Sequence, residues 1–308
     1  MATTTLHQPE AVLLAHALVA RLAEEAGARI LFIKGPTAIA LGVRPDRPST
    51  DVDVLTDRGG FVALCAALGG CGWQRRNTDT GLRLAADLAF EHSAHFIHAE
   101  WPCDLDVHYS FPGFLAPEAV VFEALWATHT TVEVAGCVVP SPSVAGQALV
   151  VALHALRDPS RATSQQDLGH VTTAVDNLDD QQRRELIGLA LETGAADTAE
   201  PILLRAGASP SPHTPSPLLR SWMLRQRYSE AAGSLWIEQF SRATWRERPR
   251  VLMRAAVPRR EVLLSSHLVD SASRRDVALL HLRRWRHGIA ALPRSMSIVR
   301  SLRKSFRD

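Results

Sequence analysis

The side chains best placed to do chemistry in this sequence are two aspartates, Asp51 and Asp53, which are separated by a single valine. Acidic and apolar residues alternate over 51–56, which predicts a strand with both carboxylates on one face. Two like charges held so close repel each other, and burying them without a partner is costly. A divalent cation resolves both problems, and Mg²⁺ prefers oxygen ligands. The pair therefore predicts a metal site.

A third carboxylate, Asp106, lies in a later segment with the same alternation. Asp104, Asp106 and His108 share one face of the strand predicted there. If that strand adjoins the first, Asp106 lies beside the other two carboxylates. We therefore predict Asp51, Asp53 and Asp106 as the metal ligands, with Asp104 as the fallback, although a position facing solvent suits Asp104 better.

Lys34 and Gly35 follow a short apolar run that predicts a buried strand over 29–33. Of the 34 Lys and Arg residues in the chain, only Lys34 and Lys304 are lysines. A lysine before a glycine, in a chain so biased toward arginine, indicates a chemical role, because a compact ammonium suits phosphate oxygens. Gly35 permits close backbone approach, and the helix beginning after Pro36 offers free amide groups to an anion.

The elements that must position these residues alternate between helices and strands. Hydrophobic periodicity and end signals predict helices over 10–26, 37–41 and 61–68, and strands over 29–33 and 51–56. Residues 73–108 are predicted to be mostly strands, in which 92–98 and 103–109 form an antiparallel hairpin.

Beyond residue 142 the periodicity is helical, with helices predicted over 145–156, 165–177 and 181–191. A run of prolines and serines over 209–217 predicts an exposed connector. The sequence thus indicates an α+β chain, with a small α/β domain over 1–140 and an all-helical domain over 141–308.

Charge is unevenly spread along the chain. Residues 1–140 carry nine basic and 16 acidic side chains, whereas 141–308 carry 25 basic and 16 acidic ones. The segment 274–308 alone has ten basic and two acidic residues. It is interpreted as a solvated helix face, a surface that docks on the acidic half, or a nucleic-acid contact. Nucleic acid is not favoured, because no recognised binding motif accompanies the charge.

The longest apolar runs fall short of the roughly 18 uncharged residues that a membrane span needs. The N-terminus lacks a basic region followed by an apolar core, so no secretory signal is visible. We therefore expect a cytoplasmic protein without a membrane partner.

Three motifs stand in a fixed order along the chain: Lys34-Gly35, the run from Arg47 through Asp51-Val52-Asp53-Val54-Leu55, and Leu105-Asp106-Val107-His108-Tyr109. In this order they resemble the uncharacterised nucleotidyltransferase family of the DNA polymerase β superfamily. That family shows a Lys-Gly element, an Arg-x-x-x-Asp-x-Asp-Leu-like strand and a carboxylate-Leu-His-Trp-like strand. Val107 and Tyr109 replace the usual Leu and Trp. The resemblance covers about residues 25–140.

The resemblance implies a polymerase β-like nucleotidyltransferase domain, with a mixed sheet and flanking helices, followed by a helical domain. It also implies an enzyme of the EC 2.7.7 type, which transfers NMP from an NTP such as ATP and releases pyrophosphate. Asp51 and Asp53 would bind two Mg²⁺ ions, with Mn²⁺ as the alternative metal. Asp106 would bind the second ion and help to deprotonate the acceptor. Lys34 would hold the triphosphate, and His108 would orient Asp106 or contact the acceptor.

One departure from the superfamily concerns the phosphate. The superfamily usually has Gly-Ser after the first strand, where this chain has Gly35-Pro36. The serine hydroxyl that would help to bind the phosphate is therefore absent, and Thr37 is the candidate substitute. Arg47 is a candidate for a phosphate contact, and a salt bridge to Asp46 or Asp57 is the equal alternative.

Other polar residues have structural interpretations that are weighed against functional ones. A zinc site would use the histidines of the predicted hairpin, His92, His95, His98 and His108. Such a site is not favoured, because zinc ligands must converge and the spacing of these histidines scatters their side chains over both faces of a strand. His154 and Asp167 are interpreted as buried helix-packing residues in preference to cleft-lining ones.

Three functions remain open at this level. The first is nucleotidylation of a small molecule, peptide or protein. The second is a non-catalytic nucleotide- or partner-binding module of the same fold, which the Gly35-Pro36 departure makes worth carrying. The third is a toxin-like enzyme that adds nucleotides to tRNA ends, which the basic second half would suit.

Overall fold

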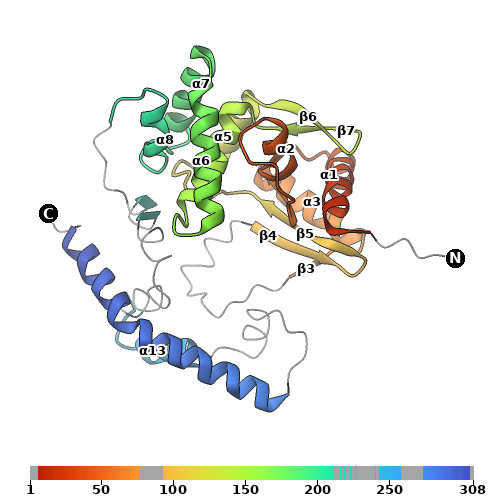
Figure 1. Ribbon diagram of the computed structural model, residues 1–308. Coiled ribbons are helices and arrows are strands. Elements are labelled where there is room, and N and C mark those ends of the chain that lie inside the picture. Colours follow the sequence, from red (N-terminus) through yellow and green to blue (C-terminus); the bar gives the residue numbers. More distant parts are fainter. Residues whose placement is uncertain are drawn as a thin grey trace. The chain divides into compact units, whose positions relative to one another are not determined.

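A computed structural model describes residues 6–76, 93–210, 243–257 and 273–305, with a few single positions between 216 and 240 (Figure 1). The chain forms two compact units. One consists of residues 1–76 and 92–222, and the other of residues 77–91 and 223–308. The domains predicted over 1–140 and 141–308 stay a prediction, and these units divide the chain differently.

The centre of the first unit is a five-stranded mixed sheet with strand order β1-β2-β5-β4-β3. β2 runs parallel to β5 and antiparallel to β1, whereas β4 is antiparallel to β5 and to β3. The strands are β1 (Ile30–Ile33), β2 (Asp51–Thr56), β3 (Gln74–Arg75), β4 (Ser93–His98) and β5 (Trp101–His108). The predicted mixed sheet and the hairpin of β4 with β5 are confirmed, although His92 lies outside the described residues.

One face of this sheet is apolar and carries a helical layer. Alternate residues of the strands, such as Phe32, Val54 and Leu105, are buried in one cluster with apolar residues of α1 (Gln8–Glu25) and α3 (Arg58–Gly70). Because successive side chains of a strand alternate between faces, this burial directs Asp51, Asp53 and Asp106 to the opposite face. The apolar core thereby fixes which way the acidic residues point.

The helices that follow the sheet belong to the same unit. α5 is buried along most of its length and packs against α2, α6 and α7 (Figure 1). The elements are α2 (Gly35–Ala40), α4 (Glu118–Ala127), the β6–β7 hairpin (Thr130–Val134, Cys137–Ser141), α5 (Val144–Leu156), α6 (Ala162–Asp176), α7 (Asp180–Glu192) and α8 (Glu200–Arg205). The helices predicted over 145–156, 165–177 and 181–191 are confirmed. Most of the predicted connector, 209–217, lies outside the described residues.

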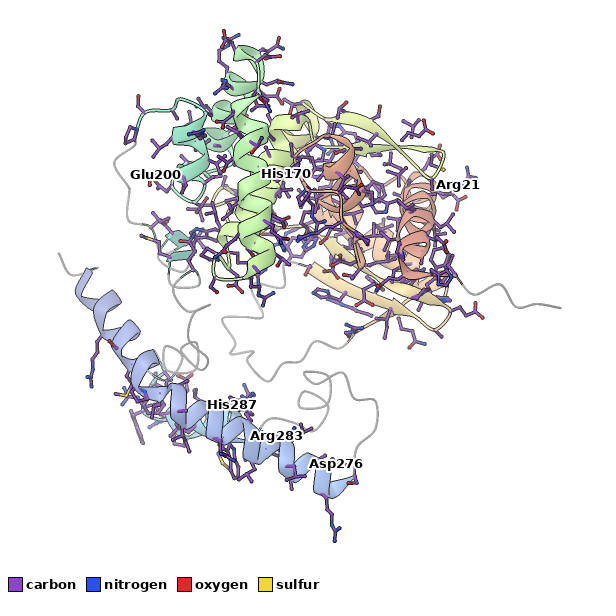
Figure 2. The ribbon with its side chains drawn as sticks, in the orientation of Figure 1. Arg21, His170, Glu200, Asp276, Arg283 and His287 are labelled. Atoms are coloured by element: carbon purple, nitrogen blue, oxygen red, sulfur yellow. The ribbon has the colours of Figure 1, made fainter. Side chains whose placement is uncertain are left out.

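In the second unit the structure describes two helices, α11 (Arg248–Ala256) and α13 (Arg274–Ser305). The indole Nε1 of Trp285 donates to the carbonyl of Ala256 over 2.6 Å, which ties them together. Figure 2 shows Arg283 and His287 on α13, whose many basic residues fit the charge distribution of the sequence. Among the described helices, none combines the length and the apolar character that crossing a bilayer requires.

Candidate active site

Lys34 connects β1 to α2 in an unusual backbone conformation. Its φ of 60° and ψ of −152° lie in a region that residues other than glycine rarely adopt. From this position the Lys34 ammonium reaches β2, where its Nζ lies 2.8 Å from Asp53 Oδ1. The side chain is only 12% exposed, so the ion pair is shielded from water.

Asp53 is the buried centre of the site, and its Oδ1 takes two partners. Besides Lys34, the Nε2 of His108 on β5 lies 3.0 Å away. Burial alone would raise the pKa of Asp53, but the charge of Lys34 and the hydrogen bond and charge of His108 outweigh it and hold the pKa well below its usual value. Asp53 is therefore ionised although it is buried.

Asp51, two residues away on the same strand, shows the opposite shift. Burial, followed by the charge of Asp53, raises the pKa of Asp51 to about 6, and Lys34 and Arg44 counter this only in part. The two aspartates differ because the ammonium of Lys34 contacts Asp53 directly. The strand thus carries one carboxylate held ionised and another that gains from a further cation.

Asp106 lies on β5 directly beside Asp53, because the parallel register pairs Asp53 with Asp106. The adjacency predicted from the sequence is therefore present. One ligand atom each from Asp53, Asp106 and His108 lies within 4.8 Å of the others. In the part of the chain that the structure describes, this is the one group of three such residues. The fallback, Asp104, instead pairs with Arg76 at 3.1 Å.

Two of the histidines contact different aspartates, which could not be assigned from the sequence. His108 contacts Asp53, and the histidine that contacts Asp106 is His95 on β4, whose pKa Asp106 raises through this contact. The ring of His98 lies 5.3 Å from that of Trp73, centre to centre, at an interplanar angle of 52°. His92 lies outside the described residues, and no group of three metal-ligating residues among the described ones contains His95 or His98.

The donor set of the site fits a hard divalent cation. Asp51, Asp53 and Asp106 offer carboxylate oxygens from two adjoining strands, and one of them is held ionised without a metal. His108 is suited to orient Asp53, because a hydrogen bond from an imidazole fixes the direction of a ligating carboxylate. The role of these residues as metal ligands stays a prediction.

Arg47 does not pair with either partner that we weighed. Its Nη2 lies 2.7 Å from Oδ2 of Asp167 on α6, whereas Asp57 caps α3 and pairs with Arg29. Asp167 is buried, as predicted, but its role is that of an ion-pair partner. The prediction is wrong for His154, which is exposed on α5.

Thr37 is not free to replace the missing serine. Its hydroxyl lies within hydrogen-bond distance of the carbonyls of Phe32 and Lys34 and accepts from Gln147, and the residue is fully buried. We therefore withdraw Thr37 as a phosphate ligand. Gly35 has a φ of +48°, and a Cβ there would lie 3.3 Å from Ser49 Oγ, so both its conformation and its surroundings favour glycine.

Gln147 is the residue that sequence reasoning missed. It is fully buried on α5, and its side-chain oxygen accepts from the backbone N–H of Lys34 over 3.0 Å. A glutamine inside the otherwise apolar run Val-Ala-Gly-Gln-Ala-Leu-Val-Val-Ala-Leu was the available signal. Buried amides need partners, so such a position indicates a specific polar network.

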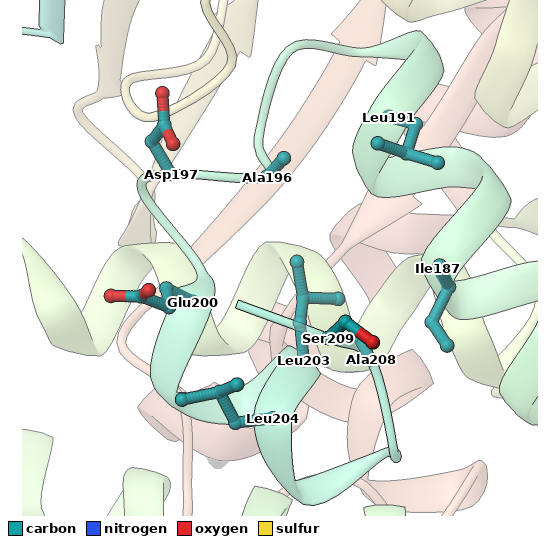
Figure 3. Close-up of a pocket in the computed structure, with 9 residues that line it drawn as sticks. All are labelled: Ile187, Leu191, Ala196, Asp197, Glu200, Leu203, Leu204, Ala208 and Ser209. Atoms are coloured by element: carbon teal, nitrogen blue, oxygen red, sulfur yellow. The ribbon is translucent and has the colours of Figure 1, made fainter. Parts of the chain in front are cut away.

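A separate pocket of about 230 Å³ lies between α7 and α8. Figure 3 shows apolar side chains such as Ile187, Leu191 and Leu204 around it, with the carboxylates of Asp197 and Glu200 on one side. None of the residues of the acidic site lines this pocket. It is therefore not part of the candidate active site.

Comparison with known proteins decides the family. The family model described as "Uncharacterised nucleotidyltransferase" matches residues 5–210. The chain belongs to this family. The match includes the acidic site and the helices α5–α8, and so confirms the resemblance drawn from the motifs.

Among curated proteins no match is found. Two solved structures show weak similarity. The antibiotic-resistance factor ANT(2'')-Ia is 15% identical with a TM-score of 0.41, over 63% of this chain and 98% of that one. An antigenic nucleotidyltransferase-like protein from Paracoccidioides brasiliensis is 14% identical with a TM-score of 0.38, over 64% and 94% of the two chains.

The backbone conformation of Lys34 leads to an unusual stability order. Lys34→Gly and Lys34→Ala both remove the ammonium, but only glycine adopts this conformation freely. We expect the glycine variant to be about 1–3 kcal/mol more stable than the alanine variant, whereas glycine is the less stable residue at ordinary sites. Urea unfolding of both variants measures this difference. An alanine variant at least as stable as the glycine variant would show that the backbone at position 34 is not strained.

The opposite pKa shifts of the two aspartates predict opposite pH dependences of stability in metal-free buffer. The pKa of Asp51 is raised on folding, so its favourable contribution is complete below pH 3.8 and is lost as the pH rises through about 6. Asp51→Asn should therefore raise Tm at pH 8 and change it little at pH 3.5.

Asp53→Asn serves as the control of opposite sign. The lowered pKa of Asp53 stabilises the fold above pH 3.8 and loses this effect only as the pH falls further. The substitution should lower Tm at pH 8, and the loss should shrink in acid. Thermal unfolding followed by circular dichroism across this pH range measures both variants, and shifts of the same sign at pH 8 would contradict the assignment.

Proposed function

We propose that this protein is a metal-dependent nucleotidyltransferase, which moves a nucleoside monophosphate from an NTP to an acceptor and releases pyrophosphate. Membership of the family supports nucleotidyl transfer. The observation that supports the metal dependence is the convergence of carboxylates on one face of the sheet: Asp53 lies beside Asp106 in the parallel register, and Asp53 is held ionised although it is buried.

The three aspartates would hold the divalent cations, and their oxygen donors favour Mg²⁺ over softer metals. When bound, the cations stabilise the attacking and leaving oxygens of the transfer. His108 keeps Asp53 oriented through the hydrogen bond to its Oδ1. Burial and the charge of Asp53 raise the pKa of Asp51, and a bound cation would lower this pKa again and keep the carboxylate ionised.

In the proposed reaction a nucleophilic oxygen or nitrogen of the acceptor attacks the α-phosphorus of the NTP. A new bond forms to this phosphorus, the bond to the bridging oxygen breaks, and pyrophosphate leaves. Asp106 would accept the proton of the acceptor. The acceptor is proposed to be a small molecule, a peptide or a protein side chain.

Basic groups near the acidic strand would hold the triphosphate. Lys34 supplies an ammonium, and the next residue, Gly35, begins α2 and supplies a backbone amide at the start of that helix. Arg47 Nη1 is buried without a hydrogen-bond partner among the described residues, while Nη2 is anchored on Asp167. An arginine anchored through one nitrogen can offer the other to a phosphate oxygen.

One observation favours a second candidate, a nucleotide-binding module without turnover. The position of the superfamily's serine is Pro36, and the hydroxyl of Thr37 is committed to the carbonyls of the backbone. Such a module would bind NTPs without releasing pyrophosphate in a broad screen of acceptors, whereas the enzyme would release it with at least one.

The proposed site is tested by isothermal titration of the full chain with each of the four NTPs and Mg²⁺. We expect Mg²⁺-dependent binding by the unmodified protein and its loss in Asp53→Asn, because the substitution removes the ionised ligand. The matched control is Asp104→Asn, which alters the same face of the neighbouring strand at a carboxylate paired with the exposed Arg76. This control should bind NTP as the unmodified protein does.

Two results would contradict the proposal. One is the absence of heat from all four NTPs at millimolar concentration with Mg²⁺. The other is equal NTP affinity in folded Asp53→Asn and in the control, since NTP binding would then not depend on the acidic site.

A further inference from the structure

The strained backbone of Lys34 is held by hydrogen bonds on both sides. Its carbonyl accepts from the N–H of Ala38 and from the hydroxyl of Thr37, at 3.1 and 3.0 Å. Its N–H donates to Gln147 Oε1 at 3.0 Å. A non-glycine residue keeps such a conformation only where its surroundings determine it. These three hydrogen bonds are the contacts that hold Lys34 in this conformation.

Gln147 is the one of these partners that comes from a distant part of the sequence. Its Nε2 lies within 3.0 Å of three acceptors, the carbonyl of Phe32, Thr37 Oγ1 and Ser141 Oγ. The side chain is fully buried, so both ends of the amide are satisfied without water. The amide thus connects the end of β1, the first turn of α2 and the end of β7.

We propose that Gln147 is a positioning residue, which holds Lys34 in its left-handed conformation and thereby keeps the ammonium on Asp53. Without Oε1, the N–H of Lys34 would be buried and unsatisfied, and the chain would relax toward negative φ. Rotation about φ redirects the Cα–Cβ bond, so the side chain would leave Asp53. The consequence for NTP binding rests on the proposed function, but the effect on Lys34 does not.

A merely structural role for Gln147 is the alternative. In that case its loss would lower stability and leave Lys34 in place. Ser141 separates the two roles, because Ser141→Ala removes an acceptor of the same amide without touching the bond to Lys34. It is the matched control.

The chain has only two lysines, which makes the position of Lys34 directly measurable. Full-length protein labelled with [¹³Cε]lysine gives ε-methylene signals from Lys34 and Lys304 alone, and Lys304→Arg assigns them. The Lys34 ammonium lies 5.8 Å from the ring centre of Phe111, so ring currents should displace its signal from that of free lysine. These spectra require neither metal nor nucleotide.

We expect Gln147→Met to move the Lys34 signal toward the free-lysine position. Ser141→Ala should leave it unchanged, because this substitution keeps the bond from the Lys34 N–H to Gln147 Oε1. If Gln147→Met does not fold, Gln147→Asn retracts the amide by one methylene and should move the signal in the same direction. A wild-type Lys34 signal in a folded Gln147→Met or Gln147→Asn protein overturns the proposal, as does an equal displacement in Ser141→Ala.

A second arm measures Mg²⁺-dependent NTP affinity of the same variants by titration. The loss of a charge-assisted contact to phosphate should weaken binding roughly tenfold or more in Gln147→Met, with affinity retained in Ser141→Ala. If the unmodified protein binds no NTP, the proposed function fails, while the lysine spectra still decide the role of Gln147. Undiminished NTP affinity in Gln147→Met would show that Gln147 does not contribute to triphosphate binding.

Discussion

The structure of the site depends on the buried carboxylate of Asp53. A charge in the interior is tolerated only when it is paired, and here a single oxygen takes both an ammonium and an imidazole. The three residues come from three neighbouring parts of the sheet, the end of β1, β2 and β5. The strand order β1-β2-β5 is thus what allows the compensation. Any rearrangement that separates these strands leaves Asp53 charged and alone.

The pairing of Asp53 also sets the properties of its neighbours. Burial of Asp51, followed by repulsion from the Asp53 charge, raises the pKa of Asp51 to about 6, because the Lys34 ammonium contacts Asp53 and offsets these effects on Asp51 only in part. The side chain of Lys34 reaches Asp53 from a strained backbone, and Gln147 on α5 binds that backbone. A helix from the middle of the sequence therefore supports the geometry of the first strands, and the family match to residues 5–210 includes both.

Much of the fold and the acidic half of the site could be predicted from the sequence. The alternation around Asp51 and Asp53 is local, and it fixes both the strand and the face. Asp106 repeats that pattern, and the parallel register with Asp53 confirms that it lies beside the pair. Lys34 could be found because lysine is so rare in this chain.

The remaining contacts join residues too far apart for local patterns to connect. Arg47 meets Asp167 across 120 positions, and Lys34 meets Gln147 across 113. Pairings of this kind depend on how helices pack on the sheet, and one sequence carries no periodic signal for them. The division of His95 and His108 between two aspartates depends likewise on strand order, which the sequence did not specify.

Asp53 is proposed to anchor a divalent-cation site, and this proposal can be tested by Mn²⁺ titration followed by electron paramagnetic resonance. Bound Mn²⁺ loses the sharp signal of the free aqueous ion. We expect the unmodified protein, titrated without nucleotide, to deplete this signal at a saturable site. We expect Asp53→Asn to leave the signal at the level of free Mn²⁺. Equal depletion by both proteins would show that Asp53 does not anchor the cation.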